Sequence, residues 1–156
     1  EEFEEYIPCQ VTLTGIGKVE HLDNAGSVPV APVGGVVSRQ AYMLRIPLDF
    51  EYEKEIVEGT YYEYVLTDTI ANIQIISLTA YDESHPAGTD VNELFMDYPL
   101  RQEDQLTDYK YGYMYGTVFY KIPRTLPQAG VHRFKVVVTT RKGEEFTKET
   151  DEITMQ

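Results

Sequence analysis

The feature that most constrains the fold is a run of six apolar residues at every second position within residues 41–53, AYMLRIPLDFEYE. Every second side chain is apolar, and these side chains would share one face of an extended strand: Tyr42, Leu44, Ile46, Leu48, Phe50 and Tyr52. A period of two is typical of a β-strand with one buried face. The opposite face carries Pro47, which has no backbone N–H, so we expect this strand to lie at a sheet edge or to contain a bulge.

Weaker patterns of the same kind predict the remaining strands, over residues 10–22, 60–67, 72–81, 109–122, 131–141 and 144–154. The alternation in the first of these breaks at Gly15 and Gly17, which indicates a bulge. Segment 72–81 is apolar on both faces, so we expect it near the centre of the core. Lys142 and Gly143 predict a tight hairpin, because glycine tolerates positive φ.

Helical periodicity is absent from the sequence, apart from one short turn expected in the long excursion 82–108. There, Asp90 and Glu93 have the spacing of a capping box. The chain is therefore predicted to be all-β, as an antiparallel immunoglobulin-like β-sandwich of about seven strands with one short helical turn in a long loop. We expect residues 1–9 to be an N-terminal extension and residues 10–156 to form a single β-sandwich domain.

The charge of the chain excludes two classes of partner. Its formal net charge is −13, which repels nucleic-acid backbones and anionic lipid head groups. No apolar run approaches the roughly 20 residues of a membrane helix, so the chain itself is not expected to insert into a membrane. The sequence opens with EEFEEYIP and no initiator Met, and we expect a mature or trimmed form.

Catalytic constellations are not evident, and we expect neither an enzyme nor a cofactor. Cys9 has no second cysteine to pair with and no base at a recognisable spacing, so a buried, inert thiol is expected. The serines and histidines lack a G-x-S-x-G motif. The glycine-rich stretch 32–37 lacks the lysine of a phosphate loop and is predicted to be a turn. Nothing favours a carboxylate pair for glycoside hydrolysis, and the chain has no Trp to stack on a sugar ring.

One loop is dense in possible metal ligands, which are Asp82, Glu83, His85, Asp90, Asn92 and Glu93. Calcium takes six to eight oxygen ligands, so such a loop is permissive for it. The EF-hand spacing is missing, however, and helix capping already accounts for the Asp90/Glu93 pair. We therefore predict no metal site, although the sequence does not decide whether loop 82–93 binds an ion.

The stretch YKYGYMYG, residues 109–116, carries the candidate binding residues Tyr109, Tyr111, Tyr113 and Tyr115 on alternate positions. In one interpretation they make cross-strand contacts inside the fold, each worth about 0.2–1 kcal/mol. In the other they form an exposed adhesive or sugar-stacking strip, because tyrosine is rigid, amphipathic and enriched at interfaces. A bulge at Gly112 or Gly116 would exchange the two faces, so the sequence leaves both interpretations open.

Several stretches together resemble a known group: VTLTGIGKVEHLDNAGSVPV, AYMLRIPLDFEYE, IANIQIISLTAYDESHPAGTDVNELF and HRFKVVVTTRKGEEFTKETDEITM. The chain is similar over most of its length to secreted, often lipid-anchored proteins of Bacteroidetes that carry a domain of unknown function. The resemblance implies a β-sandwich in the cell envelope or at the cell surface, and it supplies no catalytic residues. A lipidated Cys would begin the mature chain in such proteins, whereas Cys9 is not the first residue.

These observations predict a non-catalytic interaction or accessory protein of the cell envelope or surface, with a protein or glycan partner. It would bind no nucleic acid, and the resemblance leaves room for an N-terminal lipid anchor. The alternative is a carbohydrate-binding component of a glycan-uptake system that uses tyrosines in place of Trp.

Overall fold

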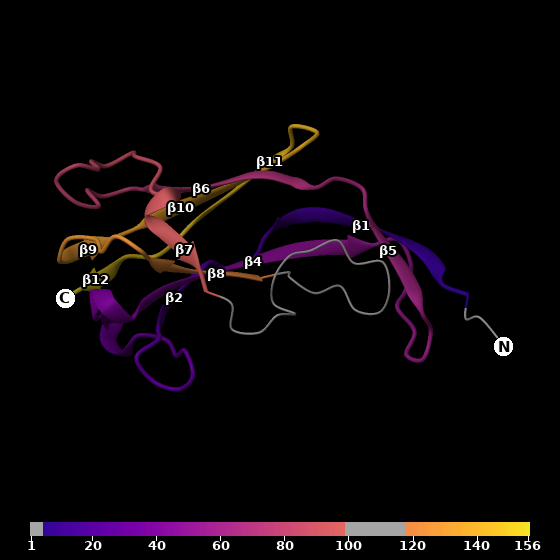
Figure 1. Cartoon of the computed structure of the whole chain (residues 1–156), viewed down its shortest axis with the longest axis horizontal. Helices are drawn as coiled ribbons and strands as arrows, with labels where there is room; N and C mark the ends of the chain where they lie inside the picture. Colours follow the sequence, from indigo (N-terminus) through magenta and orange to yellow (C-terminus); the bar gives the residue numbers. More distant parts are fainter. Residues whose placement is uncertain (1–4, 99–117) are drawn as a thin grey trace.

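The computed structural model describes residues 5–98 and 118–156, and in this part the chain is all-β (Figure 1). The largest sheet has the order β5-β1-β4-β8-β7, with β2 also paired to β4. Its strands are β1 (Ile7–Ile16), β2 (Glu20–Asp23), β4 (Tyr42–Tyr52), β5 (Tyr62–Leu66), β7 (Phe95–Asp97) and β8 (Val118–Pro123). Part of this sheet curls like half of a barrel.

Two smaller sheets complete the described fold. One has the order β11-β10-β6 and consists of β6 (Ile70–Ser77), β10 (Phe134–Thr140) and β11 (Glu145–Glu149). The other has the order β3-β12-β9 and consists of β3 (Val36–Val37), β9 (Gly130–His132) and β12 (Ile153–Met155). Three short 3-10 turns lie between strands: η1 (Val33–Gly35), η2 (Arg39–Ala41) and η3 (Asn92–Leu94). None of these turns has the length or apolarity that a membrane-spanning helix in the described residues would need.

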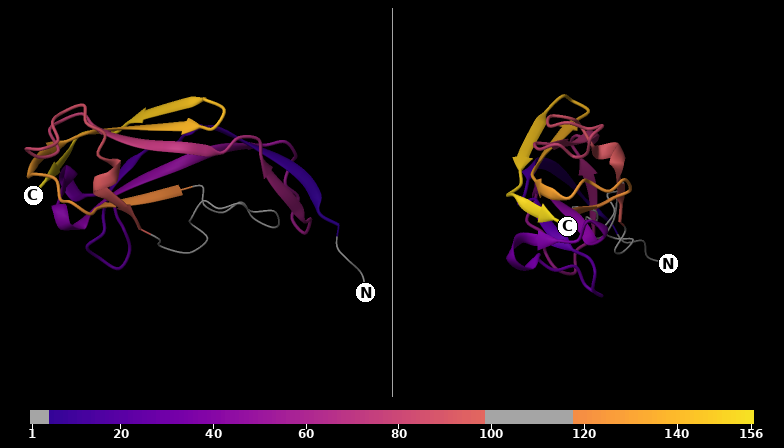
Figure 2. Two further views of the ribbon diagram at one scale, coloured as in Figure 1. Left: turned by 45° about the horizontal axis from the view of Figure 1, so that its top comes forward. Right: turned by 90° about the vertical axis from the view of Figure 1, so that its left-hand side faces the viewer.

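The main core lies between the largest sheet and the β11-β10-β6 sheet, which Figure 2 shows as separate layers. At its centre the ring of Phe134 packs against Tyr42, Tyr81 and Phe95, with ring centroids 6.0 to 6.4 Å apart. A smaller cluster at the far end of β1 contains Cys9, Val11, Tyr62 and Tyr64. The buried thiol expected for Cys9 is confirmed.

The alternation of segment 41–53 is confirmed in β4. Of the six alternating side chains, Tyr42, Leu44, Ile46 and Leu48 are buried, and Phe50 and Tyr52 are half-buried. Met43, on the opposite face, is fully buried as well. The edge position predicted from Pro47 is wrong, since β4 pairs with β1 and β2 on one side and with β8 on the other. Pro47 instead lies where the neighbour changes from β1 to β2, and its carbonyl accepts the N–H of Gly17 at 2.9 Å. The predicted bulge in β1 is confirmed by a register shift between Leu13 and Gly15.

Of the predicted antiparallel β-sandwich, only the all-β fold class is confirmed. Strands β1 and β5 pair in parallel, as do β3 and β12, so a purely antiparallel arrangement is wrong. Parallel neighbours need a long connection, and β2 and β4 supply it between β1 and β5. More strands form than the seven or so expected, they group into three sheets, and an immunoglobulin-like topology is not confirmed. Strand β1 also begins at Ile7, inside the segment assigned to an N-terminal extension.

Segment 72–81 contributes Ile75 and Tyr81 to the main core, as expected, but its strand is not covered on both faces. It contributes to β6, an edge of the β11-β10-β6 sheet, whereas β10 is central and nearly all buried. Ile75 and Ser77 point into the core while Asn72 is exposed, so only one face of β6 is covered.

Of the two predicted turn features, the hairpin at Gly143 is confirmed and the capping box at Asp90 is wrong. Gly143 has φ +93° and donates its N–H to the carbonyl of Thr140 at 3.0 Å, which confirms the hairpin between β10 and β11. The short helical turn is confirmed as η3, but Val91 is its N-cap and no side chain caps it. Asp90 instead accepts the N–H of Asn92 and that of Ile75, at 3.0 and 3.2 Å, so the capping box is wrong.

Candidate functional site

The predicted tyrosine row lies outside the described residues. Tyr109, Tyr111, Tyr113 and Tyr115 all fall in the gap between residues 98 and 118, so this candidate binding site stays a prediction. Unbroken alternation along residues 109–122 would place Phe119 on the same face as the tyrosines, and in the structure Phe119 packs against the main core from β8. Val118, Tyr120 and Ile122 on the other face are half-buried.

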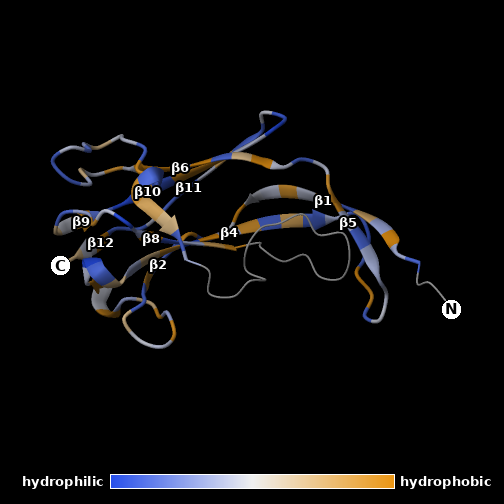
Figure 3. Cartoon of the chain, viewed as in Figure 1, coloured by the Kyte–Doolittle hydropathy of each residue, from blue (hydrophilic) through white to orange (hydrophobic). Residues whose placement is uncertain are grey.

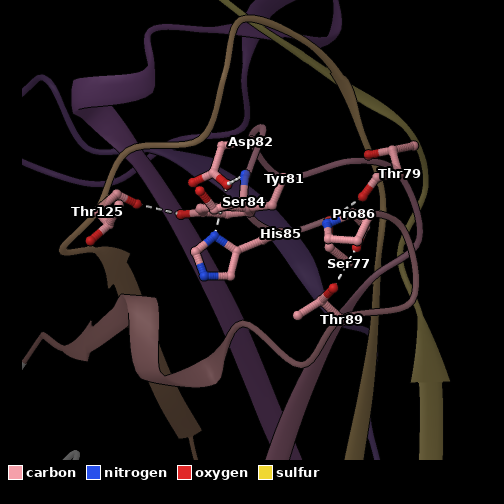
Figure 4. A network of polar contacts seen from close by, with 9 residues as sticks. All are labelled: Ser77, Thr79, Tyr81, Asp82, Ser84, His85, Pro86, Thr89 and Thr125. Carbon is pink, nitrogen blue, oxygen red and sulfur yellow. Dashed lines mark hydrogen bonds and ion pairs between the residues drawn. The ribbon is translucent and has the colours of Figure 1, made fainter.

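The carboxylate-rich loop after β6 is held by its own side chains (Figure 4). One carboxylate oxygen of Asp82 accepts hydrogen bonds from Nδ1 of His85 at 2.7 Å and from the N–H of Ser84 at 2.9 Å. The bond from His85 is the main cause that lowers the pKa of Asp82. Tyr81 anchors the loop to the core by donating its hydroxyl to the carbonyl of Thr125 at 2.6 Å, and burial raises the pKa of this hydroxyl.

These contacts leave the loop without an ion-binding arrangement. Asp82 and Asp90 each accept, with one carboxylate oxygen, a hydrogen bond from the backbone N–H two residues on, which is how aspartates stabilise turns. Within residues 5–98 and 118–156, no three side chains of Asp, Glu, His or Cys converge as metal ligands would. Two of the loop's carboxylates, Asp82 and Asp90, are thus accounted for as turn-stabilising groups.

A second polar contact ties the end of the chain to the sheet. The ring of His21, on β2, lies between the hydroxyl of Tyr42 (2.6 Å from Nδ1) and the carbonyl of Asp151 (2.8 Å from Nε2). A carbonyl only accepts, so Nε2 carries the proton and Nδ1 accepts the proton of the Tyr42 hydroxyl. Burial lowers the pKa of His21 and so favours this neutral ring.

Beside His21 lies a surface pocket of about 180 Å³. Its charged lining comes from separate segments: Lys18 and Glu20 from the β1–β2 region, and Asp151 and Glu152 from the segment before β12. Glu20 forms an ion pair with Arg45 at 3.5 Å. Asp151 and Glu152 are exposed and have no ion-pair partner in the described part of the chain.

One wall of the pocket belongs to a loop with many exposed apolar side chains, which we name the valine loop (residues 28–36). The exposed fractions are 66% for Val28, 54% for Val30, 89% for Val33 and 37% for Val36. Pro32 and Gly35 of the same loop line the pocket. The loop projects from the body on the side of β2, and Figure 3 shows hydrophobic stretches in it.

Backbone hydrogen bonds fix the valine loop. Asp23 and Val30 exchange two of them, at 2.7 and 3.0 Å, and the N–H of Asn24 donates to the carbonyl of Ala41 at 2.8 Å. At its far end, Val36 enters β3 and pairs with Thr154 of β12. The sequence predicted only a Gly/Pro-rich loop here. The available signal was four valines within nine positions of a segment that is otherwise rich in proline and glycine.

Comparison with known proteins gives one match. A family model described as a domain of unknown function (DUF5034) matches residues 16–151. No curated protein and no solved structure matches the chain. The predicted resemblance to a domain of unknown function is therefore confirmed, while the bacterial group and the secreted location stay predictions.

Proposed function

The chain belongs to the DUF5034 family, whose function is unknown, and we propose that it is a non-catalytic interaction protein of the cell envelope or cell surface. The location is supported by the resemblance to secreted and lipid-anchored proteins. The interaction is supported by the valine loop, and this single observation carries the proposal.

Exposed apolar side chains grouped on one surface mark interaction sites more often than isolated ones do. Val33 is 89% exposed and its neighbours Val28 and Val30 are more than half exposed, although the main core lies nearby. The hydrogen bonds of Asp23 and Asn24 keep the loop in this position. The folded backbone thus keeps these valine side chains exposed to solvent, where they can contact a partner.

A non-catalytic role is supported by the way the histidines are used. His21 makes two hydrogen bonds within the fold, and His85 donates to Asp82. His132 is fully buried and donates from Nε2 to the carbonyl of Gln128 at 2.7 Å. A general acid or base needs a ring nitrogen that is free to exchange a proton with a substrate, and both nitrogens of His21 and Nδ1 of His85 are already hydrogen-bonded within the chain.

The proposal is tested by site-specific crosslinking in the organism that makes the protein. A photoreactive residue at position 33 should capture a partner from the envelope fraction, whereas one at Val57, which is exposed in the connection between β4 and β5, should not. Fractionation of the same cells tests the location. Equal capture from both positions, or a chain found only in the cytoplasm, would contradict the proposal.

A glycan array decides the carbohydrate-binding alternative with the same purified chain. Binding to a defined polysaccharide that is lost in Tyr111→Ala and Tyr113→Ala, with the melting temperature unchanged, would assign the sugar site to the tyrosine row. A large loss of stability in both variants would assign these tyrosines to the core.

A further inference from the structure

We propose that the valine loop and the pocket beside it form one docking surface, and that its occupant is an extended segment of another protein carrying a lysine or arginine among apolar side chains. This inference rests on the proposed function, because it names the partner chemistry of the same surface.

The apolar half of the surface is preorganised. Valine is branched at Cβ and has one strongly restricted side-chain torsion, so binding orders little that is not already ordered. The backbone is held as well, by the two bonds between Asp23 and Val30 and by the pairing of Val36 with Thr154. Apolar side chains of a partner would therefore be buried against these valines at a low entropic cost.

The polar half is a negative pocket of limited size. Among residues 5–98 and 118–156, its exposed carboxylates Asp151 and Glu152 have no ion-pair partner, whereas Glu20 is already paired with Arg45. Lys18 lies on the lining and offsets part of this charge, and burial lowers the pKa of His21, which favours its uncharged form. The remaining charge favours a cation.

The volume indicates what kind of cation fits. About 180 Å³ is well below the roughly 300–1,000 Å³ of pockets that hold whole small molecules. A single lysine or arginine side chain is a better match, because its apolar stem can lie along Pro32 while its charged head meets Asp151 or Glu152. The valine loop adjoins the pocket, since Pro32 and Gly35 of the loop line it and are neighbours in sequence of Val33 and Val36.

The charge of the whole chain argues against two other occupants. A second copy also carries −13, so two copies repel one another at long range. An anionic bilayer is repelled for the same reason. A basic segment, in contrast, is attracted before contact, which raises its rate of association.

The test uses the full chain and synthetic peptides of about a dozen residues, long enough for an extended segment to cover such a surface. One peptide alternates valine with lysine, a second alternates valine with glutamate, and a third alternates serine with lysine. Binding is followed by fluorescence anisotropy at two salt concentrations. The valine–lysine peptide should bind about tenfold more tightly than either of the others, and less tightly at high salt.

Matched variants separate this surface from the general acidity of the protein. Val30→Ser with Val33→Ser removes the apolar half, and D151N with E152Q removes the charge. Each pair should weaken binding of the valine–lysine peptide by about tenfold. The controls V57S with V65S and E55Q with E58Q make the same changes at exposed positions elsewhere and should leave binding unchanged. All variants change exposed side chains, and their melting temperatures are compared first.

Three results would overturn the inference. The first is equal weakening by the site variants and by the controls. The second is tighter binding of the valine–glutamate peptide than of the valine–lysine peptide, or no difference in affinity among the three peptides. The third is a dimer of the chain in sedimentation velocity that Val30→Ser with Val33→Ser abolishes, because a second copy would then be the occupant. Capture at position 33 in cells is independent of all three, so the proposed function can stand when this inference fails.

Discussion

His132 is the buried titratable group whose effect on stability can be worked out most directly. It lies on β9 with no exposed surface, stacks on the ring of Phe134 at an interplanar angle of 9°, and donates from Nε2 to Gln128. Its Nδ1 is enclosed without a hydrogen-bond partner in the described part of the chain. A proton added at Nδ1 would be a buried charge, and burial lowers the pKa of His132 accordingly.

The lowered pKa of His132 in the folded state fixes the sign of the pH dependence of stability. As the pH falls through about 6.5, the unfolded chain binds a proton on this imidazole while the folded chain does not, so the free energy of unfolding decreases. The slope is at most about 1.4 kcal/mol per pH unit for one histidine. A ring that stays neutral in the folded state would therefore account for a loss of at most about 2 kcal/mol between pH 7 and pH 5.

The measurement is urea unfolding of the natural chain and of His132→Gln between about pH 7.5 and pH 5, the range in which an ordinary histidine titrates. Glutamine has no titratable proton and keeps a donor for the Gln128 carbonyl, so the variant should lose less stability on acidification. The difference between the two slopes isolates His132, because His21 and the carboxylates are common to both proteins. Val131→Gln, an exposed change on the same strand, is the control and should follow the natural chain. Parallel curves for the natural chain and His132→Gln would refute the reasoning.

Three further changes test the packing, the turn and the buried polar contact, each by denaturant unfolding. Phe134→Ala should lower the free energy of unfolding by about 3–5 kcal/mol, since it removes the fully buried ring at the centre of the core; a loss below about 1 kcal/mol would contradict that position. Gly143→Ala should lower it by about 1–2 kcal/mol because φ is +93°, while Gly15→Ala, in open space without positive φ, should not. His21→Phe should cost about 1–3 kcal/mol by leaving the Tyr42 hydroxyl unpaired, and adding Tyr42→Phe should recover much of it; additive losses would show that the contact is not coupled.

The parts of the fold that could be predicted from the sequence are those in which burial or backbone geometry acts locally. One buried face imposes a period of two directly on β4, and positive φ at the β10–β11 hairpin requires glycine at 143. The sheet neighbours were not predictable in this way. Ile7 to Val11 pair with Tyr62 to Leu66 in parallel although about fifty residues separate them, and no local pattern specifies which edge a strand will meet.

The surface site was missed for a related reason. Exposed valines in a loop have no periodicity, and the surrounding glycines and prolines give the same turn signal whether or not a loop binds anything. The pocket is assembled from three distant segments, near Lys18, Pro32 and Asp151, which come together only in the folded chain. Neither the valine loop nor the pocket can therefore be recognised as a motif in the sequence.

The long-range contacts that bring the valine loop and the pocket together also hold them in one fixed arrangement. Val36 at the end of the valine loop pairs with Thr154 of β12, and Asp151 and Glu152, two of the pocket's carboxylates, lie immediately before that strand. The carbonyl of Asp151 is in turn held by His21, whose other nitrogen meets Tyr42 of the main core. Because one chain of contacts runs from the core to both halves, a partner that touches the valines meets the carboxylates at a fixed distance. A fixed spacing of apolar and acidic groups can select a partner by the spacing of its own apolar and basic residues, which charge alone cannot do.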